Sequence, residues 1–238
     1  MSKGAVSSQL MLLAYAQGIF PMAETATDPE LFWVDPKRRG IFPLNGFHIS
    51  RSMRQFLQRN TITATLNTDF ETVLFHCANR EETWINSTLK ANYKELHALG
   101  QCHSLEVWQD EALLGGVFGI TIGGVFCGES MFSRSRNGSK SALAFLTVHL
   151  QNCGFSLFDT QFITDHLQSL GAIEISRATY QSKLADAIKL PVSITSQPIP
   201  DVHSLSLIHN SEPTRRRAIS DDDLCWKMGG GGGGGGGG

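Results

Sequence analysis

The sequence predicts an α/β protein with a mixed sheet and helices on both of its faces. The first observation is the stretch from Val125 to Gly171, which reads as strand, helix, strand and helix. A strand–helix–strand unit of this kind is typical of two parallel strands joined by a crossover helix. The second is a series of apolar runs before this stretch, with turn residues at Asp110-Glu111 and Gly123-Gly124. These runs predict an antiparallel meander.

The first hundred residues are predicted to alternate helices with short extended segments. Ser7, Ser50 and Asp69 each precede a helical pattern, as expected of residues that cap helix N-termini. Residues 37–40 are predicted to form a turn. The predicted elements are a helix over residues 9–17, extended segments over 19–22, 31–34 and 41–44, a helix after residue 50, a strand over 61–66, a helix after residue 69 and a helix, with Leu99 on its inner face, that ends at residue 100.

The second half of the chain is assigned from its hydrophobic periodicity. Three meander strands are predicted over residues 105–109, 112–120 and 123–126, and the last apolar run ends around Gly128-Glu129. A strand over residues 155–158 precedes a helix that stops at Gly171, and a last helix covers residues 179–188. The crossover helix carries apolar residues at i, i+3, i+4 and i+7, which predicts one buried face. That face consists of Ala142, Leu143, Leu146, Leu150 and Cys153.

The end of the chain differs in composition from the rest. Pro198 and Pro200 interrupt regular structure, residues 204–228 lack sustained periodicity, and the last ten residues are all glycine. Either a flexible linker or sequence that is not native to the protein has such a composition. We predict that residues 191–238 form a disordered or non-native tail without function.

Composition and motifs argue against several classes of protein. The net charge of −2 speaks against a surface coated with nucleic acid, although a local basic patch is compatible with it. No run approaches the roughly 18 apolar residues of a membrane span, and no signal-peptide pattern is visible. We therefore expect a cytoplasmic protein without a membrane segment. The dispersed cysteines, which predict reduced thiols, are Cys77, Cys102, Cys127, Cys153 and Cys225.

Common catalytic and metal-binding motifs are missing. The motifs of P-loop NTPases, α/β-hydrolases and zinc proteases do not occur. The eight histidines never stand at a spacing typical of metal ligands. We therefore expect no metal site.

Three polar residues at the ends of predicted strands form the candidate site. Glu129 follows one strand of the strand–helix–strand unit, and Asp159 and Gln161 follow the other. Ligands of open α/β sheets bind at such carboxyl ends. Asp159 and Gln161 are two positions apart and are predicted to point to the same side. The carboxylate would then orient the amide toward an incoming amine.

An amine nucleophile suits this combination of groups. An α-amino group has an unperturbed pKa of roughly 7.7–8.0, so a modest acceptor suffices to deprotonate it during attack. The alternative is that Asp159 only caps the helix that follows Gln161, and that Glu129 is an exposed charge in a turn.

Two larger groups of residues complete the candidate site. Apolar residues from two strands and the crossover helix could form a pocket, although ordinary core packing also accounts for them. They are Val117, Phe126, Met131, Leu146, Leu150 and Phe158. Basic residues near Trp33 and Trp84 could hold a single-stranded nucleic-acid end by phosphate contacts and stacking, and a solvated face is the alternative. They are Lys37, Arg38, Arg39, Arg51, Arg54 and Arg59.

Several blocks of the sequence resemble leucyl/phenylalanyl-tRNA–protein transferases. The two most specific are FCGESMFSR, from Phe126 to Arg134, and DTQFITDHLQSLGA, from Asp159 to Ala172. The blocks AYAQGIFPM, HISRSM, TWI, SK and EI-x-R agree as well, and the resemblance extends over residues 9–190.

This resemblance implies a fold and an activity. It implies a small N-terminal subdomain, residues 1–35, followed by an acetyltransferase-like (GNAT-like) catalytic domain, residues 36–190. The activity would be transfer of Leu or Phe, and less well Met, to the N-terminal Arg or Lys of proteins in the N-end rule degradation pathway. Leu-tRNA and Phe-tRNA would be the donors of a monomeric enzyme. No cofactor is implied, because an aminoacyl ester is already activated and needs no protein nucleophile.

The resemblance also implies roles for individual residues. Asp159 and Gln161 would assist the attacking α-amine, and Glu129 would help to hold the reacting groups. The apolar set would bind the transferred side chain, and the basic set the acceptor stem of the tRNA. Trp84 would contact the 3′-terminal adenosine.

Two departures from the family pattern affect these roles. Met22 stands where many members have a Trp against the adenosine, which predicts weaker stacking. Leu146 and Leu150 occupy positions that are Phe in some members, which predicts a wider pocket.

Two other functions remain open from the sequence. An acyl-CoA-dependent N-acyltransferase of the same fold needs a pyrophosphate loop of the form [QR]-x-x-G-x-[GA], and Ser135 and Lys140 around Gly138 do not match it. A non-catalytic tRNA-binding module would retain its function in an Asp159→Ala variant.

Overall fold

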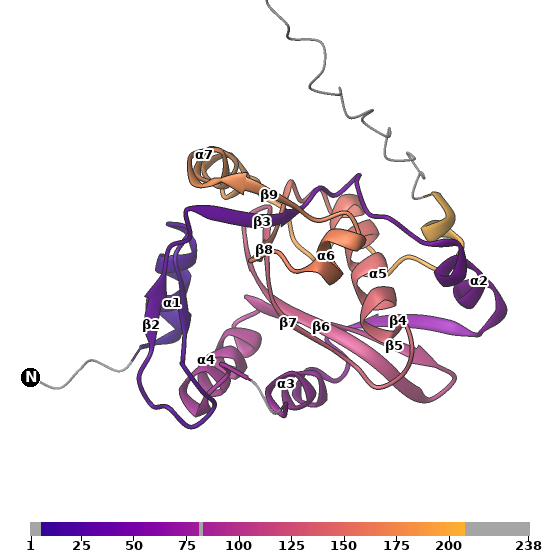
Figure 1. The fold of residues 1–238 in the computed structure, drawn as a ribbon, viewed down its shortest axis with the longest axis horizontal. Helices are drawn as coiled ribbons and strands as arrows, with labels where there is room; N and C mark the ends of the chain where they lie inside the picture. The colour runs from indigo at the N-terminus through magenta and orange to yellow at the C-terminus, as the bar shows by residue number, and fades with distance from the viewer. Residues whose placement is uncertain (1–5, 81–82, 208–238) are drawn as a thin grey trace, which may run out of the picture.

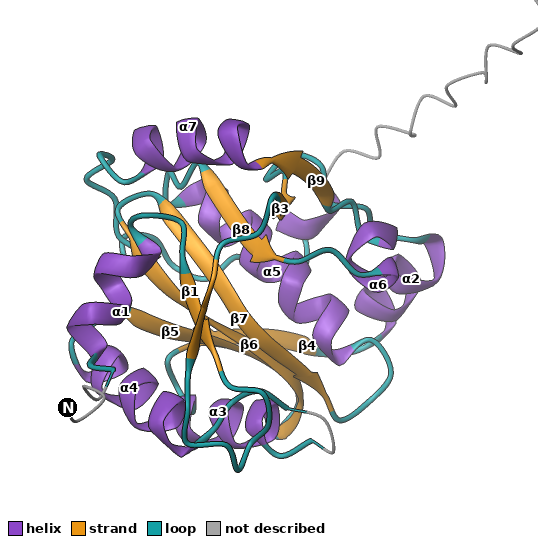
Figure 2. Ribbon diagram, turned by 60° about the vertical axis from the view of Figure 1, so that its left-hand side comes forward, coloured by secondary structure: helices purple, strands orange, loops and turns teal. Residues whose placement is uncertain are grey.

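A mixed sheet of seven strands forms the centre of the protein in the computed structural model, which describes residues 6–80 and 83–207. The strand order is β4-β5-β6-β7-β8-β3-β9, and β1 and β2 form a separate two-stranded sheet. β7 and β8 pair in parallel, whereas the other neighbours in the described sheet pair antiparallel (Figure 1, Figure 2). The strands are β1 Phe20–Met22, β2 Phe32–Val34, β3 Arg38–Phe42, β4 Ile62–Leu66, β5 Cys102–Gln109, β6 Ala112–Ile122, β7 Val125–Ser133, β8 Leu157–Gln161 and β9 Ile173–Ser176.

Helices cover both faces of the large sheet, as the sequence predicted. One hydrophobic cluster lies between the sheet and α2, α5 and α6, and a second lies between the sheet and α1, α3, α4 and α7 (Figure 1). Among the described residues, no helix combines the length and apolar character needed to cross a bilayer. The helices are α1 Ser8–Tyr15, α2 Arg51–Arg59, α3 Phe70–Ala78, α4 Ser87–Ala98, α5 Gly138–Asn152, α6 Asp165–Ser169, α7 Arg177–Ala187 and the 3₁₀-helix η1 Ser204–Leu207.

The central strands supply both clusters because successive side chains of a strand point to opposite faces. Val117, Phe126 and Phe158 belong to the first cluster, and their neighbours Phe118 and Cys127 belong to the second. The strands are therefore apolar on both faces, which accounts for their nearly continuous hydrophobic runs.

Most of the predicted elements are present. Ser7, Ser50 and Asp69 cap α1, α2 and α3, and each side chain accepts a hydrogen bond from a main-chain N–H of the first turn. The predicted parallel pairing around the crossover helix α5 is confirmed. The four cysteines within the described residues are free thiols, as predicted, and Cys225 lies outside those residues.

Three local predictions are wrong. Residues 37–40 do not form a turn, because Arg38 begins strand β3, which pairs with β8 on one side and β9 on the other. Strand β9 itself was not predicted. β7 extends to Ser133 and β8 runs from Leu157 to Gln161, so that Glu129, Asp159 and Gln161 lie within strands rather than after them. Leu99, predicted to face inward, is exposed where α4 ends.

The predicted tail begins later than residue 191. Ile194 and Leu205 are buried in the first hydrophobic cluster, and η1 lies against α5. His149 of α5 makes a 2.7 Å contact from its Nε2 to the Ile194 carbonyl oxygen. Two prolines and a lack of periodicity hid this packing, because the segment follows the core without regular structure. The rest of the predicted tail, residues 208–238, lies outside the described residues.

Candidate functional site

The candidate site lies where β7 and β8 separate. Their parallel pairing ends with Cys127 opposite Asp159. β7 shifts its register against β6 so that Glu129 has no partner residue, and β8 shifts against β3 so that Thr160 has none. Such β-bulges turn side chains away from the regular alternation of a strand. Two bulges in adjacent strands thus set the directions of Glu129 and Gln161.

Glycines permit the close backbone approach at both bulges. A Cβ atom at Gly119 would lie 2.3 Å from the carbonyl oxygen of Cys127, and one at Gly40 would lie 2.7 Å from the carbonyl group of Phe162. Gln161 has a φ of 63°, in the left-handed region that non-glycine residues seldom adopt. Its main-chain N–H donates a 2.8 Å hydrogen bond to Asp159 Oδ1, which stabilises this conformation.

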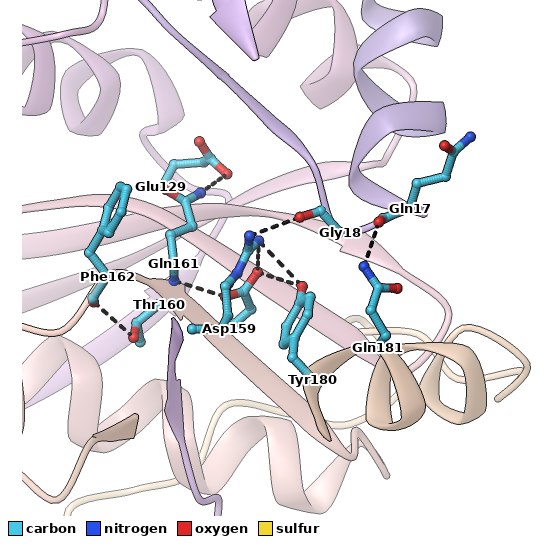
Figure 3. A network of polar contacts seen from close by, with 10 residues as sticks. Gln17, Gly18, Glu129, Asp159, Thr160, Gln161, Phe162, Tyr180 and Gln181 are labelled. Carbon is cyan, nitrogen blue, oxygen red and sulfur yellow. Dashed lines mark hydrogen bonds and ion pairs between the residues drawn. The ribbon is translucent and has the colours of Figure 1, made fainter. Parts of the chain in front are cut away.

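Asp159 forms a buried ion pair with Arg39. Arg39 Nε donates to Oδ1 over 2.9 Å and Nη2 donates to Oδ2 over 2.6 Å, while the side chains are 1% and 0% exposed. The Tyr180 hydroxyl also donates to Oδ2, over 2.8 Å (Figure 3). Burial and the neighbouring Asp159 charge raise the pKa of Tyr180 well above its ordinary value. The four hydrogen bonds received by Asp159 occupy its carboxylate fully.

Arg39 also connects its ion pair with Asp159 to the N-terminal segment. Its Nη1 donates to the carbonyl oxygen of Gly18 over 2.9 Å, and its guanidinium lies over the rings of Phe20 and Tyr180 at 4.6 and 4.5 Å. Burial opposes the charge of Arg39, but the hydrogen bond and charge of Asp159 prevail and raise its pKa. The structure therefore corrects the placement of Arg39 among the tRNA contacts, since its side chain has no access to the surface.

Glu129 is buried among neutral hydrogen-bond donors. Gln161 Nε2 donates to Oε1 over 3.0 Å, and the Tyr93 hydroxyl donates to Oε2 over 2.7 Å. Burial raises the pKa of Glu129 to about 7, against the lowering effect of the Tyr93 hydrogen bond. The buried Tyr15 hydroxyl also lies near Glu129. It has no partner at close hydrogen-bond distance, yet it lowers the pKa of Glu129, and burial and the Glu129 charge raise its own pKa.

This geometry revises the predicted pairing of the polar residues. The side-chain amide of Gln161 binds Glu129, whereas Asp159 binds the main chain of Gln161. The bulge and the positive φ turn Gln161 away from the side expected from two-residue alternation. The two alternative roles are excluded as well. Thr164, and not Asp159, caps α6. Glu129 is only 7% exposed, so it is not an exposed charge in a turn.

A mainly apolar cavity of about 110 Å³ opens beside Glu129. Of the predicted pocket residues, Val117, Met131 and Phe158 line it. Phe126 packs edge-on against Phe158, with ring centroids 5.4 Å apart, and lies in the core rather than in the wall. The full lining is Val117, Gly128, Glu129, Ser130, Met131, Leu143, Phe158, Thr160 and Leu167.

The crossover helix faces the cavity through a different residue than predicted. Leu146 and Leu150 are buried in the first hydrophobic cluster, 1% and 0% exposed, and are not part of the lining. Leu143, one turn earlier, takes their place, together with Leu167 of α6. Helical periodicity identified the inner face of α5 but not which turn lies at the open end of the sheet.

The residues predicted to contact tRNA do not form a single cluster. Lys37 and Arg38 are exposed on or beside β3, and Arg38 is paired with Glu174 of β9 over 2.8 Å. Arg51 and Arg59 are exposed on α2, where Arg54 is half-buried. The aromatic and thioether contacts, Trp84 and Met22, are half-buried against the second hydrophobic cluster.

Several residues of the site gave no signal in the sequence. Tyr15, Tyr93 and Tyr180 were visible only as apolar positions of helices, and their hydroxyl groups reach the carboxylates only in the folded chain. Within the described residues, no three side chains of His, Cys, Asp or Glu gather in an arrangement that could hold a metal ion.

Comparison with known families gives a clear result. Residues 41–185 match the family model described as leucyl/phenylalanyl-tRNA protein transferase, and residues 4–37 match the model of that family's N-terminal domain. The chain belongs to this family. The leucyl/phenylalanyl-tRNA–protein transferase of Jannaschia sp. (strain CCS1) is 55% identical over 193 residues, covering 81% of this chain and 91% of that protein. The protein of the same name from Ruegeria sp. (strain TM1040) is 56% identical over 195 residues, covering 82% and 93%.

Similarity to solved structures is more distant. L-PGS from Bacillus licheniformis aligns with a TM-score of 0.39 and 11% sequence identity, over 63% of this chain and 56% of that chain. No argument about fold or function follows from a similarity at this level.

Proposed function

We propose that this protein transfers an aminoacyl group from aminoacyl-tRNA to the α-amine at the N-terminus of a protein. The observation that carries the proposal is the Gln161–Glu129 hydrogen bond beside a mainly apolar cavity, in a chain of the leucyl/phenylalanyl-tRNA–protein transferase family. The donors are Leu-tRNA and Phe-tRNA, and less well Met-tRNA. The acceptors are proteins that begin with Arg or Lys.

The cavity receives the side chain of the transferred amino acid. Val117, Leu143, Phe158 and Leu167 give it an apolar wall, and Met131 is a flexible part of that wall. Apolar cavities discriminate weakly between hydrophobic groups of similar size. A wall of this kind therefore accepts Leu, Phe and Met and rejects charged side chains.

The reaction needs positioning and a proton acceptor. The neutral α-amine attacks the ester carbonyl carbon, the bond from that carbon to the ribose oxygen breaks, and an amide bond forms. The amide nitrogen of Gln161 is fixed on Glu129, so its carbonyl oxygen is held in one place to accept a hydrogen bond from the amine. Orientation of this kind contributes a large part of the rate of group transfer.

The two carboxylates have different roles in this proposal. Asp159 is fully occupied by hydrogen bonds, so it positions Gln161 and does not act as the base. Glu129 lines the cavity and has a pKa of about 7, suited to proton exchange near neutral pH. It takes a proton from the attacking amine and returns one to the leaving ribose oxygen, so that protons balance.

We extend the proposal to the division of the chain into two domains. Residues 1–35 form a small N-terminal subdomain, and residues 36–190 form the catalytic domain, with an acetyltransferase-like fold. The split between parallel strands β7 and β8 after Cys127 supports this fold, because it opens the sheet at the cavity. Action as a cytoplasmic monomer remains a prediction.

The test is a transfer assay with purified components. Labelled Leu-tRNA is supplied with a peptide that begins with Arg, and with the same peptide acetylated at its N-terminus. We expect leucine on the free peptide only. Gln161→Ala should lower kcat about 100-fold with little change in the KM for Leu-tRNA, because the amide acts on the amine rather than on the tRNA. Absence of transfer by the wild-type protein, alongside an active relative, would refute the proposal.

A further inference from the structure

A second cleft, of about 410 Å³, lies beside the amino-acid cavity and is lined by a different set of residues. α3 and the short segment after it contribute His76 and Arg80. The end of β7 and the following loop contribute Ser133 and Arg134, and α6 contributes His166. The full lining is His76, Asn79, Arg80, Met131, Phe132, Ser133, Arg134, Ser139 and His166. None of the roles described above uses this cleft.

The cleft and the cavity are joined through three residues. Met131 lines both of them. Arg80, in the wall of the cleft, donates a hydrogen bond from Nη2 to Ser130 Oγ, and Ser130 lines the cavity. A ligand that places its side chain in the cavity therefore reaches the cleft with the part of the molecule that is attached next.

The charge of the cleft is positive. Its lining contains two arginines and two histidines, and no Asp or Glu side chain. Arg134 forms no ion pair with any described residue, and neither does Arg80. Burial and the nearby positive charge of Lys140 lower the pKa of His166, so the positive charge of the lining comes from its two arginines.

The wall of the cleft also presents neutral donors. The side chains of Asn79 and Ser139 in the lining supply an amide and a hydroxyl donor, whereas the Ser133 hydroxyl donates to the Ser135 carbonyl oxygen. The His76 ring is stacked on Phe132 with centroids 4.8 Å apart. Two guanidinium groups with amide and hydroxyl donors form a combination that suits the oxygens of a phosphate group.

We propose that this cleft binds a phosphate of the 3′-terminal nucleotides of the donor tRNA, with Arg80 and Arg134 as its principal anion ligands. The inference rests on the proposed function and extends it. With the aminoacyl side chain in the cavity, the terminal ribose is attached directly to the ester, and the first phosphate follows one sugar away. The cleft that shares Met131 with the cavity lies within this reach. Arg80 thus links the bound phosphate to Ser130 at the edge of the cavity.

Two aminoacyl donors, one with the terminal phosphates and one without, distinguish an effect on phosphate binding from an effect on catalysis. Leu-tRNA carries the terminal phosphates, and leucyl-adenosine without a phosphate carries only the reactive end. For Arg134→Gln and Arg80→Gln we expect the KM for Leu-tRNA to rise about tenfold each, the usual effect of losing a charge-assisted hydrogen bond. For Arg134→Gln the kcat/KM for leucyl-adenosine should stay at the wild-type value. Arg80 also holds Ser130 at the cavity, so only Arg134→Gln is compared between the two donors. Lys183→Gln, an exposed substitution on α7, which contributes no residue to the cleft, serves as the control.

Equilibrium binding tests the same proposal without catalysis. The dissociation constant of uncharged tRNA should rise about tenfold in Arg134→Gln, and its logarithm should depend less steeply on the logarithm of salt concentration, by about 0.7 per lost phosphate contact. With tRNA that lacks its 3′-terminal nucleotides, Arg134→Gln and the wild type should bind equally. Arg80→Lys, which keeps the charge, should bind complete tRNA more tightly than Arg80→Gln does.

The outcomes distinguish this proposal from the proposed function. Equal losses with both donors, an unchanged affinity for complete tRNA, or an equal loss with truncated tRNA would each overturn the assignment of the cleft. If the wild-type protein transfers no leucine, the proposed function fails, and the binding comparison still decides about the cleft. The main-chain N–H of Arg134 donates to the Leu114 carbonyl oxygen, but its side chain makes no hydrogen bond with the described residues that a substitution would break, so its variant reports on the ligand and not on folding.

Discussion

Two buried carboxylates lie on the neighbouring strands β7 and β8 of this protein, and their surroundings differ. Asp159 receives a bidentate hydrogen bond from Arg39 and has its charge neutralised. Glu129 receives hydrogen bonds from Gln161 and Tyr93, which are neutral, and its pKa is about 7. A buried carboxylate beside a cation is a fixed part of the scaffold, whereas one beside neutral donors exchanges its proton near neutral pH. The same residue class therefore serves for positioning in one place and for proton transfer in the other.

Removing the Arg39 cation beside Asp159 should have the largest effect on the difference between the two carboxylates. Arg39→Met leaves the Asp159 charge buried without its partner, which typically destabilises a protein by about 3–5 kcal/mol. We expect a loss of that size in the free energy of unfolding, measured by urea denaturation, together with loss of transfer activity. The activity falls because Gln161 depends on Asp159 for its main-chain conformation.

A neighbouring arginine provides the control for this change. Arg38, one position earlier on β3, forms an ion pair with Glu174 in which its side chain is 59% exposed. Arg38→Met should cost less than about 1 kcal/mol, as surface ion pairs do. Adding Asp159→Asn to Arg39→Met should restore part of the stability, because it removes the unpaired charge. Equal effects of the two arginine substitutions would contradict the role assigned to the buried pair.

Glu129→Gln tests the other carboxylate through the pH dependence of the rate. If ionised Glu129 accepts the proton of the amine, the wild-type kcat/KM rises with pH through about 7, the pKa of Glu129. The glutamine variant should lose the part of this rise that belongs to Glu129, keep the part that comes from deprotonation of the peptide's own α-amine, and fall about 100-fold below the wild type at pH 8. A variant that kept both the rate and the pH profile would exclude Glu129 as the proton acceptor.

The same substitution has a predicted effect on stability. Because the pKa of Glu129 is raised to about 7 in the folded state from an ordinary value of 4.5, the folded protein holds a proton between these pH values that the unfolded chain releases. The contribution of Glu129 to stability is therefore greatest below pH 4.5 and declines as pH rises to about 7, by roughly 3 kcal/mol. In Glu129→Gln this decline should disappear from urea denaturation curves recorded across that range.

The sequence predicted much of the fold and the membership of the candidate site, but not its internal contacts. Periodicity and capping residues located α1, α2 and α3, because these signals are local. The first part of strand β3 was missed because its two arginines, Arg38 and Arg39, suggest a solvated turn, and only pairing with distant strands makes this part a strand. The Gln161–Glu129 contact depends on two β-bulges, which glycines hint at but do not specify.

The smallest predicted effects compare the two tyrosines beside Glu129. Tyr93→Phe removes a hydroxyl that donates to Oε2 and lowers the pKa of Glu129. The rise of kcat/KM with pH should move upward by about one pH unit, with a severalfold lower rate at pH 7. Tyr15→Phe removes a buried hydroxyl that makes no close hydrogen bond but still lowers the pKa of Glu129, so the profile should move upward by less than in Tyr93→Phe. If Tyr15→Phe moved the profile as far as Tyr93→Phe, the Tyr93 hydrogen bond would not be what distinguishes the surroundings of Glu129.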